Sequence, residues 1–455
     1  MKRFLLILIL MTNLGFCFSA DAETIQFYQC VNTWDKGFQT FQAKHPEISY
    51  EWSDEYYANT SELVGRLLTS ELHSDLLGIA TTNIDAKQIM KKGFFLDLSD
   101  STVINNMMQQ MIPAIADAAM IDGKVYAFPY HVAFDYWKVD QIGWDIAGLD
   151  LSCIPHSYPD FLDFLEMWCD RIEKNPENNI RVWNGWDASV YNSSSYTQLL
   201  TEILINNVIM QSEFAEQELS FSADELIPLL KRAQVIGQRI YELEPPLQIS
   251  DLGFGYSLFQ PITRLSWPED SSYIVSMRIH NDQPELVRAI VTMMAVSRAT
   301  NSPALCTELI EDICTSLADD MKPYLLIHGE AVEKSSYKED LSKAQQHVDD
   351  TIEKLKSKSL EPDRRDQLEQ DLESYRKVLE LTETNRYLVT PNQVADYQQH
   401  ANQLYVATPG VFSPGTDGYI NVNRLEQQFS SGLIPAEDFL KRLNDIARMV
   451  RLEGI

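Results

Sequence analysis

The sequence predicts an α/β protein with two domains, and three observations support this prediction. The chain has 455 residues, whereas a single hydrophobic core stops growing at roughly 250–300 residues. Short apolar strands alternate with amphipathic helices along much of the chain, which is typical of a mostly parallel sheet covered by helices. Apolar residues make up 45% of the chain and charged residues 23%, as in ordinary globular proteins.

The first residues have the pattern of a secretory signal peptide. Two basic residues precede an apolar run over residues 4–11, and small residues at 20–22 offer a cleavage site. The run is too short to span a bilayer, so we expect residues 1–22 to be removed and the mature chain to be extracytoplasmic. Cys17 raises the alternative of a lipid anchor. Free secretion is favoured, because the bulky Phe16 stands where lipoprotein signals carry a small residue.

The next hundred residues are predicted to alternate strand and helix. In order, the predicted elements are a strand at 24–31, a helix that ends at His45-Pro46, a strand at 47–53, a helix through Leu72, a strand at 74–80 and a helix at 84–92. Asp122-Gly123 then stands between two short apolar segments, which is a strong signal for a β-hairpin.

The alternation resumes beyond Tyr136. A helix carries an apolar stripe, and the stripe consists of Phe161, Phe164, Leu165, Trp168 and Ile172. A strand is predicted at 272–279, a helix from Asp282 to Met294 and a last helix from Pro435 onward.

Residues 331–384 differ from the rest of the chain. They are rich in charges of both signs, with thinly spaced apolar residues and a break at Ser359–Pro362. This pattern predicts an inserted, exposed helical hairpin with a narrow apolar seam. A solvated insertion is the favoured interpretation, because charge runs usually face water; a partner-binding surface is the alternative.

Charge and cysteine content exclude several classes of function. The formal net charge is -29, which argues against nucleic acid and anionic membranes as partners. Five of the six cysteines follow the predicted cleavage site, and none forms a C-x-x-C pair. An odd, sparse set of thiols is neither a disulfide scaffold nor a zinc site. The histidines are scattered singly, so we expect no metal and no cofactor.

Several motifs, taken in order, resemble one known family. The motifs are FQAKHPEISYEW, SELHSDLLGIATTNIDAKQIMKKGFFLDLSD, DGKVYAFPY, FDYWKVDQIGWDIAGLDLSCIPHSYPDFLDFLEMW and FSSGLIPAEDFLKRLNDIARMV. The chain resembles the extracellular solute-binding proteins of ABC transporters, in the carbohydrate-binding family that includes maltose-binding protein. Three features depart from that family: the insertion at 331–384, the unusual signal peptide, and the lack of a Gly-rich segment before the Pro261 region.

The resemblance implies the periplasmic-binding-protein fold, with two α/β lobes, a hinge and a ligand cleft between them. The first lobe would comprise residues 23–130 and 278–330, and the second residues 131–277 and 385–455. It also implies a monomer that captures a carbohydrate, in particular an oligosaccharide, and delivers it to a membrane permease.

Candidate ligand-binding residues follow from the rule that ligands sit beyond the carboxyl ends of strands in α/β sheets. The rule selects several loops, and the resemblance adds the crossover into the second lobe and the position where relatives keep a sugar-stacking aromatic. The candidates from these places are Asn32, Trp34, Asp35, Thr82, Asn83, Tyr130, His131, Trp183, Trp186, Trp267 and Tyr419. Flat rings suit the apolar faces of a pyranose, and Asp, Asn and Thr suit its hydroxyl rim. Each residue has a structural alternative: Trp34 as a core ring, for example, or Asp35 as a helix cap.

Two other classes of function remain as alternatives. A secreted glycoside hydrolase would need two carboxyl groups about 5–10 Å apart across the sugar. No segment singles out such a pair, so we predict no catalytic residues and no enzyme. A sensing or interaction protein would instead use the 331–384 hairpin. If the chain is a transport protein, a peptide or a polyamine is an alternative ligand.

Overall fold

A computed structural model describes most of the chain. The described residues are 23–29, 35–53, 60–69, 71–82, 84–176, 180–183, 193–243, 256–357, 361–407 and 417–453. Within them, no helix combines the length and the apolar character needed to cross a membrane.

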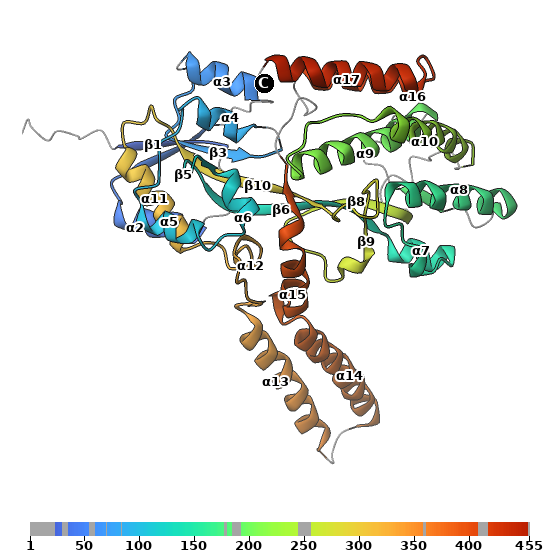
Figure 1. Cartoon of the computed structure of the whole chain (residues 1–455). Coiled ribbons are helices and arrows are strands. Elements are labelled where there is room, and N and C mark those ends of the chain that lie inside the picture. The colour runs from blue at the N-terminus through green and yellow to red at the C-terminus, as the bar shows by residue number, and fades with distance from the viewer. Residues whose placement is uncertain are drawn as a thin grey trace, which may run out of the picture.

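One mixed sheet runs through the whole body (Figure 1). Its strands, in spatial order, are β2 (Ser49–Ser53), β1 (Thr24–Tyr28), β3 (Leu76–Ala80), β10 (Val287–Val296), β6 (Phe128–Val139), β8 (Ser257–Arg264) and β7 (Arg181–Trp183), with β13 (Leu404–Val406) paired to β10 and β9 (Ile274–Val275) paired to β6. The pairs at the two ends, β2–β1–β3 and β8–β7, are parallel. The central pairs β3–β10, β10–β6 and β6–β8 are antiparallel. The sheet is therefore less uniformly parallel than the sequence predicted.

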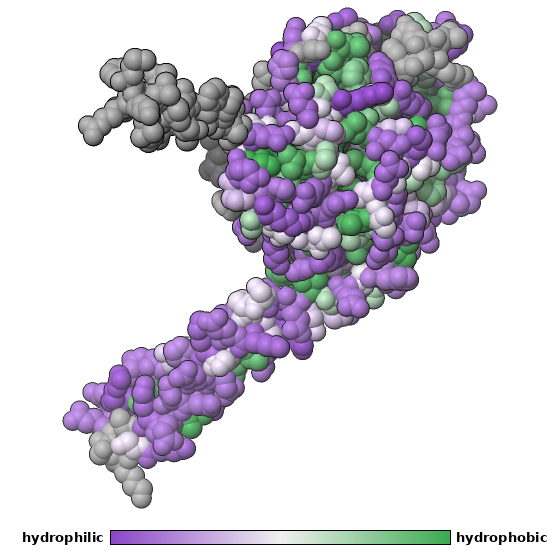
Figure 2. All heavy atoms as spheres, turned by 90° about the vertical axis from the view of Figure 1, so that its left-hand side faces the viewer, coloured by the Kyte–Doolittle hydropathy of each residue, from purple (hydrophilic) through white to green (hydrophobic). Residues whose placement is uncertain are grey.

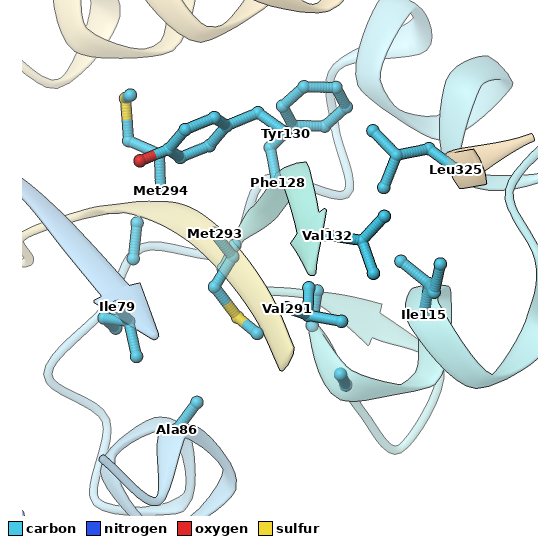
Figure 3. Packing of buried hydrophobic residues seen from close by; sticks show 14 of the residues in the cluster. Ile79, Ala86, Ile115, Phe128, Tyr130, Val132, Val291, Met293, Met294 and Leu325 are labelled. Carbon is cyan, nitrogen blue, oxygen red and sulfur yellow. The ribbon is translucent and has the colours of Figure 1, made fainter. Parts of the chain in front are cut away.

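Two hydrophobic cores divide this sheet into two lobes. The first core contains buried residues of β1, β3, the start of β6 and most of β10, and the second contains residues of β7, β8 and the end of β6. Figure 3 shows part of the first core, where Phe128 and Val132 of β6 lie beside Val291 and Met293 of β10. Strand β6 runs from the first core into the second, and β10 follows a segment whose residues Val275, Met277 and Ile279 are buried in the second core. The chain therefore crosses between the lobes at these two paired strands.

Helices cover the sheet on both faces (Figure 1). The helices of the first lobe are α2 (Asp35–Lys44), α3 (Thr60–Leu68), α4 (Ala86–Lys91), α5 (Thr102–Met108), α6 (Pro113–Ala118), α11 (Pro303–Thr315), α12 (Lys322–Leu325) and α15 (Pro391–His400). Those of the second lobe are α7 (Gln141–Ala147), α8 (Tyr158–Lys174), α9 (Ser193–Phe214), α10 (Ala223–Leu243), α16 (Asp417–Ser430) and α17 (Ala436–Glu453).

Two local predictions are confirmed in detail. Helix α8 begins after Ser157, whose side chain accepts a hydrogen bond from the Asp160 amide, and every residue of the predicted stripe is buried. Such a cap satisfies one of the amides that a helix start leaves unpaired. The hairpin of β4 (Met120–Ile121) and β5 (Lys124–Val125) turns through two residues with positive φ, 50° at Asp122 and 75° at Gly123. This geometry is the one that Asp-Gly favours.

The helix predicted from Asp282 to Met294 is wrong, because most of this stretch is the central strand β10. Its residues alternate between buried and half-buried from Val287 to Met293 and are then continuously buried. A short apolar run does not distinguish a buried strand from a helix by periodicity alone. Pairing with β3 on one side and β6 on the other decides the conformation here.

The first core also takes residues that the sequence assigned to the second lobe. Trp267, Val389, Val394, Tyr397 and Leu404 all belong to the first cluster. Strand β13 explains part of this placement, since it pairs with β10 from Val287 to Ala289. The last segment of the chain therefore crosses the first lobe before it enters the second at α16.

The inserted segment forms two long helices that project from the body (Figure 1). Helix α13 (Tyr337–Leu355) and helix α14 (Pro362–Thr384) pack on each other and leave the body at the short pair β11 (Val332–Glu333) and β12 (Tyr387–Val389). The surface of this α13–α14 hairpin is predominantly hydrophilic (Figure 2).

Candidate functional site

A cavity of about 460 Å³ lies where the two lobes meet. The middle of β6, the start of β10 and strand β13 line one side of it, and helices α9 and α16 of the second lobe line another. Pockets of roughly 300–1,000 Å³ are typical of small-molecule sites. We refer to this space as the interlobe cavity.

An ion pair lies between the two strands that connect the lobes. Asp135 on β6 and Arg288 on β10 are direct partners in the antiparallel register, and their side chains approach to 2.8 Å. The Thr263 hydroxyl also donates to Asp135, at 3.4 Å. Opposite charges at directly facing positions stabilise an antiparallel pair. The guanidinium of Arg288 is thus held by a carboxylate that lines the same cavity.

Glu213, in the last turn of α9, links the second lobe to the first. Its carboxylate accepts a hydrogen bond from the Tyr405 hydroxyl on β13. Burial raises the pKa of Glu213; the Tyr405 hydrogen bond and the nearby Arg288 charge oppose that increase, while Asp85 adds to it. A change in the angle between the lobes would therefore break or reshape this contact.

Two further carboxyl groups lie on facing helices of the second lobe. Burial raises the pKa of Glu202 on α9, although a hydrogen bond from Gln198 at 2.9 Å opposes the shift. Burial, with a smaller contribution from the charge of Glu202, raises the pKa of Glu426 on α16 to about 8. Glu426 is therefore mostly protonated at neutral pH, which lets it donate a hydrogen bond.

Asn207 contributes an unsatisfied acceptor. Its side chain is 3% exposed and lines the interlobe cavity. Its Oδ1 has no hydrogen-bond partner among the described residues. Buried amide oxygens are nearly always paired, so an unpaired one at a cavity wall points to a missing donor.

The cavity is well suited to ligands that carry many hydrogen-bond donors. Its polar lining includes five carboxyl groups and the Asn207 amide, together with Asn206, Ser271 and Ser276. Arg288 and Tyr405 already donate to Asp135 and Glu213. Apolar side chains such as Ile203 and Met277 complete the wall. Together these groups match a molecule with apolar faces and a rim of hydroxyl or amine groups.

The structure does not bring the predicted ligand residues to this cavity. Thr82 and His131 are half-buried, and desolvation lowers the pKa of His131, although the charge of Asp320 partly opposes the shift. Tyr130 is buried in the first core, beside Phe128 and Met294 (Figure 3). None of the described members of the predicted set is among the residues that line the cavity.

The two described tryptophans of the predicted set are packing residues in this structure. Trp183 is 4% exposed and contacts the ring of Tyr196, with centroids 5.3 Å apart. Trp267 is 1% exposed, and its Nε1 donates to Asp396 at 2.6 Å. Both side chains therefore lie in a core in this structure, which is the structural alternative to ligand contact.

The remaining predicted residues lie outside what the structure describes. Asn32, Trp34, Asn83 and Trp186 fall between described segments. Asp35 begins α2 and Tyr419 lies in α16, but their side chains are not described. Contact of these residues with a ligand stays a prediction.

Sequence reasoning missed the cavity residues, although a local signal was present. In α9, Asn207 interrupts the apolar stretch ILINNVIM and Glu202 directly precedes it. In β10, Arg288 interrupts the apolar strand VRAIVTMMAV. A polar residue inside such a stretch needs a partner or a function. The partners lie far along the chain, so the signal would have identified the residues but not the cavity they share.

An exposed indole lies at the carboxyl end of β2. Trp52 is 45% exposed and stacks on Phe27, with ring centroids 5.2 Å apart and planes 11° apart. Because the carboxyl ends of strands form the ligand side of an open α/β sheet, Trp52 is a further candidate platform for a flat ligand.

Comparison with known proteins identifies the fold. No protein-family model matches the chain, and no curated protein matches it. Solved structures do match over nearly the whole length. An ABC substrate-binding protein from Listeria monocytogenes, solved with cycloalternan, has a TM-score of 0.52 at 11% identity, covering 96% of this chain and 100% of its own.

Two other solved structures agree with this match. A chitin oligosaccharide binding protein has a TM-score of 0.52 at 10% identity over 95% of this chain and 100% of its own. A cyclic α-maltosyl-1,6-maltose binding protein from Arthrobacter globiformis has a TM-score of 0.50 at 12% identity over 94% of this chain and 98% of its own. The chain therefore has the two-lobed α/β fold found in the sugar-binding proteins of ABC transporters.

Proposed function

We propose that the chain is an extracytoplasmic solute-binding protein that captures an oligosaccharide between its lobes and delivers it to an ABC transporter permease. The observation that supports this proposal is the similarity to sugar-binding proteins over at least 94% of this chain, together with a cavity at the junction of the lobes. In this proposal the protein acts as a monomer and catalyses no reaction.

The chemistry of the interlobe cavity supports a hydroxylated ligand. Carboxylate oxygens of Asp135 and Glu213 accept hydrogen bonds from hydroxyl groups, and a protonated Glu426 donates to a ring or hydroxyl oxygen. A site built on such groups rejects a ligand that leaves them unpaired. The predicted loop residues, among them Trp34 and Trp186, would extend the same site at the strand ends.

Ligand capture would proceed by closure of the lobes. Strand β6 runs from the first core into the second, and the hydrogen bond between Glu213 and Tyr405 is a contact between the lobes. A ligand shifts the open and closed populations only by as much as it prefers one of them. The closed form would be the one presented to the permease, which ties transport to occupancy.

A binding role, rather than hydrolysis, agrees with the printed names of the similar structures, which are binding proteins. Incubation of the protein with an oligosaccharide that it binds, followed by chromatography, should return the oligosaccharide intact. Appearance of shorter products that scale with protein concentration would instead establish a glycoside hydrolase.

A thermal-shift panel tests the proposed ligand class. The panel contains neutral and charged oligosaccharides, amino acids, peptides and polyamines. We expect at least one oligosaccharide to raise Tm by several degrees at a concentration about 100 times its Kd. Binding of another solute class, with no response to any glycan, would refute the sugar assignment.

A matched pair of variants locates the site. Ser276 lines the interlobe cavity, whereas Ser374 is exposed on α14. Ser276→Trp should fill the cavity and abolish the ligand-induced shift, and Ser374→Trp should leave it unchanged. Circular dichroism of both variants checks that they fold. A full ligand response in folded Ser276→Trp would place the site elsewhere.

A further inference from the structure

We infer that the glycan held in the interlobe cavity bears at least one ammonium group, as an oligosaccharide of amino sugars with free amines does. This inference rests on the proposed function and names the class of ligand within it. Two independent observations support it, the balance of charges around the cavity and the unpaired acceptor of Asn207.

The charge balance of the cavity is negative, although Glu426 is mostly protonated at neutral pH. Its described lining contains five carboxyl groups, those of Asp135, Glu202, Glu213, Glu285 and Glu426. Asp135 pairs with Arg288 at 2.8 Å, and Glu285 pairs with Arg278 at 3.2 Å.

The other three carboxyl groups form no salt bridge in the described part of the chain, although the Arg288 charge acts on Glu213. Glu202 receives a hydrogen bond from an amide and Glu213 from a phenol, and neither they nor Glu426 take part in a salt bridge there. Of the two that stay ionised, Glu213 is exposed and Glu202 is half-buried. A partly desolvated carboxylate without a counter-charge is costly, and a cation that enters the site recovers part of that cost.

Asn207 adds a second reason to expect a donor. It lines the same cavity and is only 3% exposed, and its Oδ1 has no hydrogen-bond partner among the described residues. An ammonium group has three donors and no acceptor. It therefore complements this wall better than a hydroxyl group, which brings an acceptor with each donor.

Other charged ligands fit less well. An acidic sugar would need a free cation, but Arg288, the permanently charged cation of the described lining, is committed to Asp135. His400 Nδ1 is engaged with the Asp396 carbonyl at 2.9 Å. A metal ion is not supported either, because the described residues contain no group of three His, Cys, Asp or Glu side chains suited to hold one.

A matched pair of ligands tests the inference. Glucosamine oligosaccharides and their N-acetylated counterparts of equal length differ in the charge on nitrogen. Isothermal titration at a pH at which the free amine is protonated should give at least about tenfold tighter binding for the amine form, and the preference should weaken with added salt.

Isosteric variants test which groups are responsible. Glu202→Gln and Glu213→Gln should each weaken binding of the amine form about three- to tenfold more than binding of the N-acetylated form, because only the amine form loses a charge–charge interaction. Glu369→Gln on the exposed face of α14 is the control and should change neither. Tm of each variant without ligand checks folding.

The outcomes separate the inference from the proposed function. Equal or tighter binding of the N-acetylated form overturns the inference and leaves a sugar-binding protein. A preference for the amine form that survives both Glu variants also overturns it, because the charge would then be recognised elsewhere. Binding of a polyamine with no response to any glycan refutes the proposed function and the glycan inference together.

Discussion

The interlobe cavity and the α13–α14 hairpin are both rich in carboxyl groups, but these groups differ in their exposure to water and in their salt bridges. On the hairpin, Lys343–Glu339 and Lys377–Glu373 are ion pairs at 2.6 and 3.0 Å, with side chains 63–71% exposed. In the cavity, Glu426 is 5% exposed and has no salt bridge among the described residues. Water solvates the hairpin carboxylates, whereas Glu426 is shielded from it.

Packing follows the same division. The hairpin buries few side chains, chiefly Ala344, Val348, Thr351 and Leu368. The lobes bury clusters of large rings, such as Phe134 with Trp267, Tyr324 and Tyr397 at centroid distances of 5.2–5.6 Å. The comparison teaches that the contribution of a residue to the free energy of unfolding depends on its surroundings and not on its type alone.

The largest expected effect comes from the aromatic cluster of the first lobe. Phe134→Ala removes a fully buried ring that contacts three others. We expect a loss of about 3–5 kcal/mol in the free energy of unfolding, from lost burial and an unfilled cavity. Urea unfolding monitored by tryptophan fluorescence measures it.

Leu368→Ala is the matched change in the hairpin. It removes the main buried side chain of α14, and we expect it to loosen the hairpin without moving the unfolding midpoint of the lobes. Equal destabilisation of the lobes by the two variants would contradict the division between body and hairpin.

The next effect concerns the buried carboxyl of Glu426. Its pKa is raised from 4.5 to about 8, so the folded protein keeps a proton that the unfolded chain releases within that window. Stability should therefore fall as pH rises from about 4.5 to 8 and level off above it. Glu426→Gln cannot ionise, and we expect a gain of about 1–3 kcal/mol at pH 8 with little change near pH 4.5.

Tm measured across this pH range for the wild type and Glu426→Gln tests the sign. Glu369→Gln, on the exposed surface of α14, is the control that should follow the wild-type profile. A wild-type protein that becomes steadily more stable from pH 5 to 8, with no gain in Glu426→Gln, would mean that this carboxyl is solvated.

The smallest effect should come from removing the hairpin. Replacement of Tyr337–Thr384 by a short Gly-Ser linker leaves the β11–β12 pair, where the Lys334 amide donates to the Arg386 carbonyl. We expect Tm to change by no more than about 2 °C and ligand affinity to stay within about twofold, because the hairpin lines neither core nor cavity. Loss of ligand binding would instead make the hairpin part of the binding apparatus.

Prediction from sequence succeeded where a residue's conformation depends on its neighbours in the chain. The α8 stripe, the Asp122-Gly123 turn and the two helices of the insertion all repeat a pattern within a few residues. It failed at β10, where the short apolar run fits either conformation and pairing with β3 and β6 decides.

The candidate site shows the same limit. The sequence led to aromatic residues at strand ends, yet Trp183 and Trp267 are packed in the lobes. A tryptophan carries no local sign of which surface will cover it, because both a core and a sugar favour a flat apolar ring. The rule about strand ends fixes the side of the sheet and not the exposure of each ring.

The sequence by itself determined the two-domain α/β class, the helical stripes and the projecting insertion, because periodicity and turn chemistry act over short distances. Only the tertiary structure decided the interlobe cavity. Asp135 meets Arg288 across 153 positions of the chain, and Glu213 meets Tyr405 across 192. Such contacts arise from strand register and helix packing, which place charges together that no local pattern connects.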